Sequence, residues 1–113
     1  MIRHENSPIE NVYLADFYYY GLIEESYKIC EAISLYEKTI NSIENLNFKS
    51  FNYFNSFCIL GRAFFTGENG VIEINYGRAE SYFKKAWKFE VDKNERERVK
   101  SSLKRIENKK NKD

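Results

Sequence analysis

The chain has 113 residues, of which 18 are Lys or Arg and 17 are Asp or Glu, and its formal net charge is +1 at pH 7. A chain of this length predicts one domain, which can bury roughly two thirds of the surface that the unfolded chain exposes. The balanced total charge argues against a general affinity for nucleic acid, and no run of 18 apolar residues is present to span a membrane.

The first predicted hairpin covers about residues 8–44. Pro8 suits the first turn of a helix with Ser7 as its N-cap, and this helix is expected to continue to Gly21. The second helix has apolar residues at helical spacing. Its expected buried stripe consists of Ile29, Ala32, Ile33, Tyr36, Ile40 and Ile43. A short polar connection follows over residues 45–50.

The second predicted hairpin covers about residues 51–90. The expected buried face of its first helix consists of Phe57, Leu60, Gly61 and Phe64. Because an interior glycine costs a helix roughly 1 kcal/mol relative to alanine, Gly61 predicts a close approach of the partner helix. Gly67 is placed to end this helix in the left-handed conformation, and Asn75 to cap the next one. The expected stripe of that next helix consists of Tyr76, Ala79, Phe83, Ala86 and Trp87.

The two hairpins resemble each other at a nearly fixed offset, which indicates an internal repeat. LADFYYYG (14–21) recurs as LGRAFFTG (60–67) after 46 residues, with a closing glycine in both copies. AISLYEKT (32–39) recurs as AESYFKKA (79–86) after 47 residues. Small side chains are expected as notches where ring-bearing helices pack together, at Ala15, Gly61, Ala79 and Ala86.

The second hairpin resembles the Sel-like repeat family, a relative of the tetratricopeptide repeats, over about 35 residues. The matching residues are Leu60-Gly61-x-x-Phe64-x-x-Gly67, Gly70-Val71 and Asn75-Tyr76-x-Arg78-Ala79-x-x-Tyr82-Phe83-x-Lys85-Ala86. The departures are Asn75 for an acid, Phe64 for tyrosine and Trp87 for a second alanine, and the first hairpin has no Gly-Val pair. The resemblance implies an all-α fold, namely a right-handed stack of two antiparallel αα-hairpins that form a Sel-like or tetratricopeptide-like solenoid. It also implies a holder of other proteins and not an enzyme.

A last helix is predicted over about residues 92–108, with Asp92 and Glu95 as a capping box. Its thin apolar stripe consists of Val99, Leu103 and Ile106. A terminal unit of a repeat array needs a polar outer surface, so this helix is expected to cap the stack. Residues 109–113 are expected to be frayed.

Charge is unevenly distributed along the chain. Residues 1–83 carry six basic and eleven acidic side chains, and residues 84–113 carry twelve and six. The basic segment is explained either as a solvated tail or as a docking patch for an acidic partner. Nucleic acid is a weaker alternative, because the segment lacks interleaved aromatic residues and contains six acids.

The sequence contains no catalytic, metal-binding or nucleotide-binding motif, and His4 is its only histidine. We therefore expect no catalytic residue, no metal site and no cofactor. Cys30 and Cys58 are predicted to be thiols packed in or near the core. The polar amino-terminal residues predict no secretory signal, so a cytoplasmic location is expected.

In tetratricopeptide-like solenoids the first helix of each hairpin lines the concave face. The residues that remain on these helices after removal of the expected buried positions are the predicted partner-binding set. They are Tyr13, Asp16, Tyr19, Tyr20, Asn55, Ile59, Arg62 and Phe65. The alternative is that the rings pack against the neighbouring hairpin, with Asp16 and Arg62 forming a weak surface pair.

These observations predict a non-enzymatic protein–protein interaction module whose concave face binds a protein partner, without nucleic acid or membrane insertion. The small size suggests a bacterial immunity protein that neutralises a cognate toxin or effector domain. A scaffold or adaptor subunit of a signalling or envelope-associated assembly is the alternative, and an enzyme is a further one that no motif supports. Two hairpins and a cap are few for a repeat array, so a second copy of the chain, forming a homodimer, is another expected occupant.

Overall fold

A computed structural model of the chain describes residues 7–21 and 26–112, and these residues form five α-helices and no strand. The all-α prediction is therefore confirmed. The chain divides into two compact units, Met1–Leu46 and Asn47–Asp113, and each unit is described by itself. The boundary lies within the predicted polar connection.

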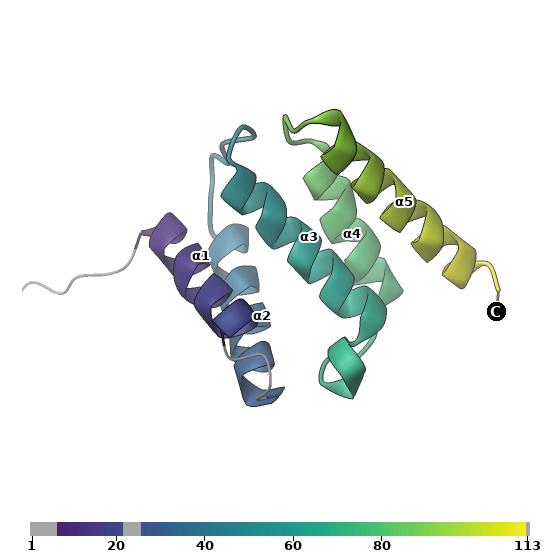
Figure 1. The fold of residues 1–113 in the computed structure, drawn as a ribbon, viewed down its shortest axis with the longest axis horizontal. Helices are drawn as coiled ribbons and strands as arrows, with labels where there is room; N and C mark the ends of the chain where they lie inside the picture. The colour runs from purple at the N-terminus through teal and green to yellow at the C-terminus, as the bar shows by residue number, and fades with distance from the viewer. Residues whose placement is uncertain (1–6, 22–25, 113) are drawn as a thin grey trace, which may run out of the picture. The chain divides into compact units, whose positions relative to one another are not determined.

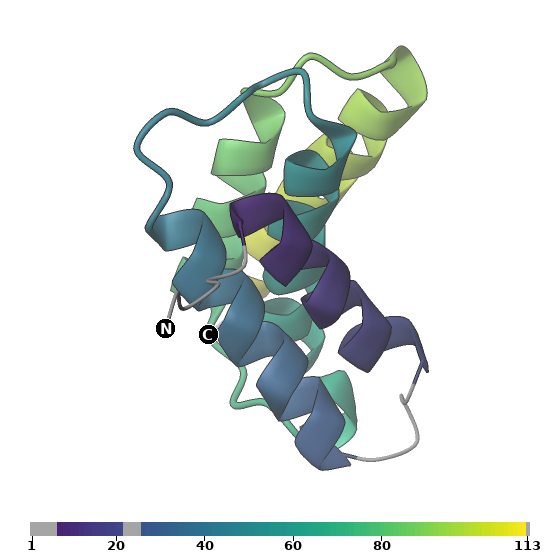
Figure 2. The same cartoon turned by 90° about the vertical axis from the view of Figure 1, so that its left-hand side faces the viewer.

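The first unit is a hairpin of α1 (Pro8–Asp16) and α2 (Ser26–Asn41). The two helices lie side by side and run in opposite directions (Figures 1 and 2). The predicted start of α1 is confirmed, because the Ser7 hydroxyl accepts a hydrogen bond from the Glu10 N–H at 3.3 Å and the Glu10 carboxylate accepts one from the Ser7 N–H at 3.2 Å. The predicted stripe of α2 is buried except at Ile43, which lies beyond the end of the helix and is half-buried.

The end of the first helix differs from the prediction. A π-helical turn, η1 (Phe17–Gly21), continues the helix directly after Asp16. Gly21 is the last residue of this turn and does not have the positive φ angle of a left-handed cap. The glycine that recurs in both copies therefore ends the two helices in different ways.

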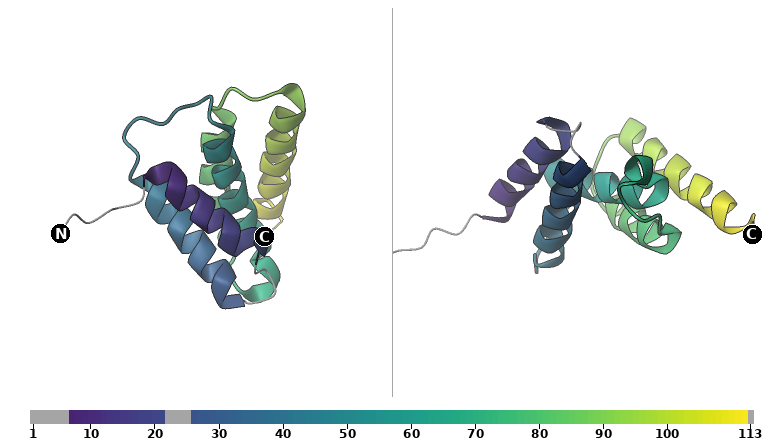
Figure 3. Two further views of the ribbon diagram at one scale, coloured as in Figure 1. Left: turned by 60° about the vertical axis from the view of Figure 1, so that its left-hand side comes forward. Right: turned by 90° about the horizontal axis from the view of Figure 1, so that it is seen from below.

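The second unit contains α3 (Phe51–Thr66), α4 (Tyr76–Trp87) and α5 (Lys93–Lys110). Successive helices run in alternating directions, and a short 3₁₀ turn, η2 (Glu68–Gly70), lies between α3 and α4 (Figures 1 and 3). Gly67 has a left-handed φ of 75°, and the Asn75 side chain accepts a hydrogen bond from the Arg78 N–H at 3.0 Å. Both predicted caps are confirmed, whereas α5 continues to Lys110, beyond its predicted end.

Gly61 lies directly against the ring of Phe83. A Cβ atom on Gly61 would lie 2.6–2.8 Å from three carbon atoms of that ring, so only glycine fits without a shift of the ring. All four predicted notches are buried. The close approach predicted from the interior glycine is therefore confirmed, and α3 and α4 pack at a separation that a larger side chain would increase.

One aromatic residue of α4 differs from the prediction, and another is buried without having been predicted in the stripe. Trp87, predicted in the buried stripe, is 39% exposed, and the guanidinium of Arg96 lies 4.3 Å from its ring centroid. Tyr82 is buried and stacks on Phe64, with ring centroids 6.0 Å apart. Trp87 is the last residue of α4, and its ring packs against the Arg96 guanidinium of α5 and not in the core.

Candidate protein-binding surfaces

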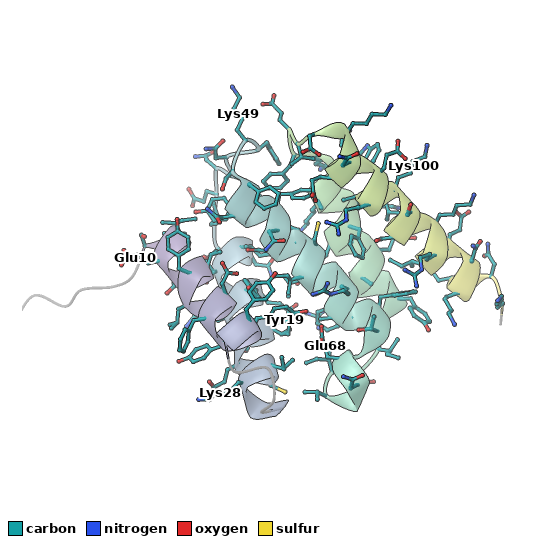
Figure 4. The ribbon with its side chains drawn as sticks, in the orientation of Figure 1. Glu10, Tyr19, Lys28, Lys49, Glu68 and Lys100 are labelled. Carbon is teal, nitrogen blue, oxygen red and sulfur yellow. The ribbon has the colours of Figure 1, made fainter. Side chains whose placement is uncertain are left out.

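Of the predicted binding residues in the first unit, Tyr13 and Tyr20 are exposed and Tyr19 is only 6% exposed. Tyr19, labelled in Figure 4, lies seven residues after Val12 and therefore on the same side of the helix as that core residue. Its ring packs edge-on against the ring of Tyr36 in α2, at 6.5 Å between centroids. The prediction that Tyr19 is a surface residue was wrong, because helical spacing places its ring in the hairpin core.

Asp16 is half-buried, and its carboxylate accepts a hydrogen bond from the hydroxyl of Tyr36. Burial raises the pKa of Asp16 above its ordinary value, and the hydrogen bond from Tyr36 lowers it by less. Burial and the neighbouring carboxylate also raise the pKa of Tyr36, so its hydroxyl remains a donor. The end of α1 is thus bonded to the middle of α2 by a side-chain pair that the sequence did not predict.

An exposed stripe of large apolar side chains follows α1 into η1. We call it the aromatic stripe, and it consists of Tyr13, Leu14, Phe17 and Tyr20. These side chains are 37–58% exposed. Tyr13 and Leu14 lie in the last turn of α1, and Phe17 and Tyr20 lie in the η1 turn that continues it directly. Leu14 and Phe17 were missed as surface residues.

Three exposed rings and a leucine present on the order of 300–400 Å² of apolar surface, if each half-exposed ring contributes about 100 Å². That is comparable with the largest apolar patch on a typical monomer, which is often functional. The stripe is therefore the most pronounced apolar feature on the described surface of the first unit.

The predicted residues of the second unit have three different environments. Arg62 is exposed, Asn55 and Phe65 are half-buried, and Ile59 is only 3% exposed. Ile59 belongs to a second buried stripe of α3, together with Ser56 and Ala63. The expectation that Ile59 is exposed was wrong, because it assumed one buried face on α3 whereas this helix has two.

Phe65 packs within its own unit. Its ring centroid lies 5.6 Å from that of Tyr76 in α4, and the guanidinium of Arg105 in α5 lies 5.8 Å from it. The alternative interpretation expected such rings to pack against the neighbouring hairpin, whereas these contacts of Phe65 are with its own hairpin and with α5. Its contact with Arg105 nevertheless places it at the surface where α3 and α5 meet.

Three exposed arginines gather along that surface, and we call them the arginine face. They are Arg62 of α3 and Arg98 and Arg105 of α5. Arg98 and Arg105 are seven residues apart and lie on one side of α5, as Arg62 and Phe65 do on α3. The contact of Arg105 with the Phe65 ring brings these sides of α5 and α3 next to each other.

The two cysteines differ in exposure. Both are thiols, but Cys30 is exposed, contrary to the expectation that it packs in or near the core. Cys30 precedes the first buried pair of α2 by two residues, which turns it away from α1. Burial, with a contribution from Glu95, raises the pKa of Cys58 to about 12, so this thiol stays protonated and unreactive near neutral pH.

Within residues 7–21 and 26–112, no group of three or more His, Cys, Asp or Glu side chains is placed to hold a metal ion. His4 lies outside the described residues. Among the helices of the described part, none is both long enough and apolar enough to cross a membrane.

No protein-family model, curated protein or solved structure matches the chain. The similarity to Sel-like repeats therefore rests on the residues quoted above and stays a prediction.

Proposed function

We propose that this chain is a non-enzymatic module that binds a protein partner through the aromatic stripe on α1 and η1. The observation that carries the proposal is the run of four large apolar side chains, 37–58% exposed, along the continuous segment of α1 and η1. Exposed apolar side chains that are scattered singly need no explanation, whereas a contiguous set marks an interaction surface. Tyrosine is also among the residues that contribute most to the affinity of protein interfaces.

Residues in the core of the hairpin pack against the aromatic stripe. Tyr19 packs between the exposed Tyr20, at 4.9 Å between ring centroids, and the buried Tyr36, at 6.5 Å. The bond between Asp16 and Tyr36 holds the residue at which α1 becomes η1. A surface that is ordered before binding loses less conformational entropy in the complex, so this arrangement supports a binding role.

A short Sel-like or tetratricopeptide-like stack is the fold that we propose for this module. Residues of the quoted motif contact one another, since Arg78 lies 4.5 Å above the Phe64 ring and Phe64 stacks on Tyr82. These contacts and the Gly61–Phe83 notch support the resemblance of the second hairpin. A stack of consecutive repeats predicts nuclear Overhauser contacts between α2 and α3, and their absence would reject it.

The partner that we propose first is a toxin or effector domain, which makes the chain a bacterial immunity protein. A dedicated inhibitor should bind the product of the adjacent open reading frame in the nanomolar range or below. A scaffold or adaptor subunit, the alternative role, should bind several partners more weakly. Isothermal titration with the adjacent gene product distinguishes the two roles.

The stripe itself is tested by Phe17→Ser/Tyr20→Ser. Loss of two exposed rings from the centre of an interface should weaken binding by tenfold or more, on the order of 1 kcal/mol or more for each ring. Phe51→Ser is the matched control, because Phe51 is 55% exposed but lies on the second unit. If the double variant keeps its helical circular dichroism and binds like wild type, the stripe is not the binding surface.

A further inference from the structure

The arginine face is a second surface with its own chemistry. Arg105 lies over Phe65 near the end of α3, and Arg98 lies seven residues before Arg105 on the same side of α5. Arg62 is four residues after Cys58 and three before Phe65, so it lies on the same side of α3 between the two. The three guanidinium groups therefore lie on the sides of α3 and α5 that adjoin where Arg105 covers Phe65.

One acidic side chain, Glu95, lies beside the arginine face. Glu95 is the acidic side chain that acts on Cys58 from α5, and its carboxylate lies 3.5 Å from Arg98. The Arg98 side chain of this pair is 79% exposed, so the ion pair is weak and open to solvent. The three arginines of the face outnumber Glu95, which leaves the face with an excess of positive charge.

We propose that the arginine face binds an acidic segment of a protein. Guanidinium groups donate paired hydrogen bonds to carboxylates, and three exposed ones on adjoining sides of two helices suit a segment with several Asp or Glu side chains. Phe65 adds an apolar edge next to Arg105, where a neighbouring aliphatic or aromatic side chain of the segment packs. The inference rests on the proposed protein-binding function and specifies the chemistry of the partner.

The surroundings favour a protein over a nucleic acid. Single-stranded nucleic acids bind where several exposed rings offer successive bases a stacking platform. The arginine face contains one ring, which is half-buried and already packed against Tyr76. Glu95 would also repel a continuous line of phosphates, whereas a peptide with spaced carboxylates avoids it.

The opposite side of α5 supplies a control within the same helix. Lys100 and Lys104 are exposed, and Lys100, labelled in Figure 4, lies two residues after Arg98 and therefore about 200° around the helix. Arg98→Gln/Arg105→Gln and Lys100→Gln/Lys104→Gln each remove two positive charges from α5. If binding depends only on net charge, both variants should lose the same affinity for an acidic peptide. If it depends on the arginine face, only Arg98→Gln/Arg105→Gln should lose affinity.

The test is fluorescence anisotropy with a labelled twelve-residue peptide of alternating Glu and Gly, titrated with the full-length chain. The expected result is binding that Arg98→Gln/Arg105→Gln weakens about fivefold, as for two exposed ion pairs, while Lys100→Gln/Lys104→Gln binds like wild type. Arg62→Gln should weaken binding by a smaller factor. Thermal unfolding followed by circular dichroism verifies that each variant is folded.

Four results would overturn the proposal. Equal weakening by both double variants would show general electrostatic attraction, and no binding of the peptide by the wild type would show that the face is not an acidic-segment site. Tighter binding of a single-stranded oligonucleotide of equal charge, lost in Arg98→Gln/Arg105→Gln, would assign the face to nucleic acid. Dimers in light scattering that this variant dissociates would assign it to a second copy of the chain. Because the probe needs no natural partner, a failure here leaves the aromatic stripe to be judged by its own variants.

Discussion

The two hairpins align residue by residue in the sequence but close by different chemistry. Ala15 and Tyr36 of the first correspond to Gly61 and Phe83 of the second, at offsets of 46 and 47. In the second hairpin the phenylalanine ring packs against a glycine that leaves room for it. In the first, a tyrosine at the same place bonds its hydroxyl to Asp16, the neighbour of the small residue. One spacing thus accommodates either a steric notch or a polar anchor.

The helix ends differ in the same way. Gly67 turns into the left-handed region and stops α3, whereas Gly21 does not, and the chain passes from α1 into η1. The π-helical turn extends the first helix by residues that include Phe17 and Tyr20. Half of the aromatic stripe therefore exists because the first hairpin lacks the left-handed cap of the second.

The largest effect is expected at the steric notch. Gly61→Ala should lower the free energy of unfolding by about 1–2 kcal/mol, because overpacking against Phe83 outweighs the gain in helix propensity. Urea unfolding of the purified variant measures this difference. In the first hairpin the reverse change, Ala15→Gly, should cost about 1 kcal/mol through helix propensity and a small cavity.

Gly77→Ala is the matched control for the notch. Gly77 is exposed on α4, and a Cβ atom there would meet only the Asn75 carboxamide oxygen within 4 Å, at 3.4 Å. This variant should be as stable as wild type or slightly more stable. If Gly61→Ala behaves like Gly77→Ala, Phe83 moves aside at no cost and the notch does not set the packing of α3 on α4.

The next effect concerns the polar anchor. Tyr36→Phe removes the hydroxyl that donates to Asp16 and should cost about 1 kcal/mol, the usual net contribution of one hydrogen bond. Tyr13→Phe is the control, because Tyr13 is exposed and its hydroxyl is solvated, so its loss should change stability by less than about 0.5 kcal/mol. Equal stability of the two variants in urea unfolding would show that the anchor contributes nothing to the first hairpin.

Most of the fold could be predicted from the sequence, because its signals are local. The caps at Ser7, Gly67, Asn75 and Asp92 depend on side chains within three or four residues, and all of them form. The buried stripes of α2 and α3 follow from helical spacing. The π-helical turn could not be predicted, because its sequence, FYYYG, contains no pattern that marks a change from an α-helix to a π-helix.

The candidate site was predicted less well than the fold. Tyr13 and Tyr20 are exposed as expected, but Tyr19 and Ile59 are buried. The comparison of the two hairpins at a fixed offset assigned one orientation to both first helices, whereas the burial of a side chain depends on every element packed around it. The contact between Arg105 and Phe65 was missed for the same reason, since it joins α5 to α3 across a long stretch of the sequence.

A smaller, stabilising effect is expected at Thr39, which corresponds to Ala86 of the second hairpin. Thr39 is buried, and its hydroxyl has no hydrogen-bond partner among the described residues. Thr39→Val keeps the shape and removes the unsatisfied hydroxyl, so it should raise the free energy of unfolding by about 0.5–1 kcal/mol. Ser81→Val, on the exposed side of α4, should give no such gain. A loss of stability in Thr39→Val would indicate that the hydroxyl is solvated.

The smallest expected effect is a pH dependence of the free energy of unfolding that arises from Asp16 in the first hairpin. The pKa of Asp16 lies above its ordinary value of 3.8, because burial outweighs the hydrogen bond from Tyr36. A raised pKa contributes stability that is complete below the unfolded pKa and is lost as pH rises through the folded pKa. Asp16→Asn keeps an oxygen acceptor for Tyr36 but cannot ionise, so it should gain a few tenths of a kcal/mol over wild type as pH rises from about 3.5 to 6.5, a modest effect because Asp16 is partly exposed.

Urea unfolding across this pH range measures the gain, and the Tyr36→Phe background sharpens it. Without the hydroxyl, the one interaction that lowers the pKa of Asp16 is removed, so the difference between Asp and Asn should increase more steeply with pH. Gly61→Ala should leave that pH dependence unchanged, because the Gly61–Phe83 contact contains no ionisable group. If the stability difference between wild type and Asp16→Asn does not depend on pH in either background, Asp16 is fully hydrated. The polar anchor and the steric notch would then not differ in their electrostatics.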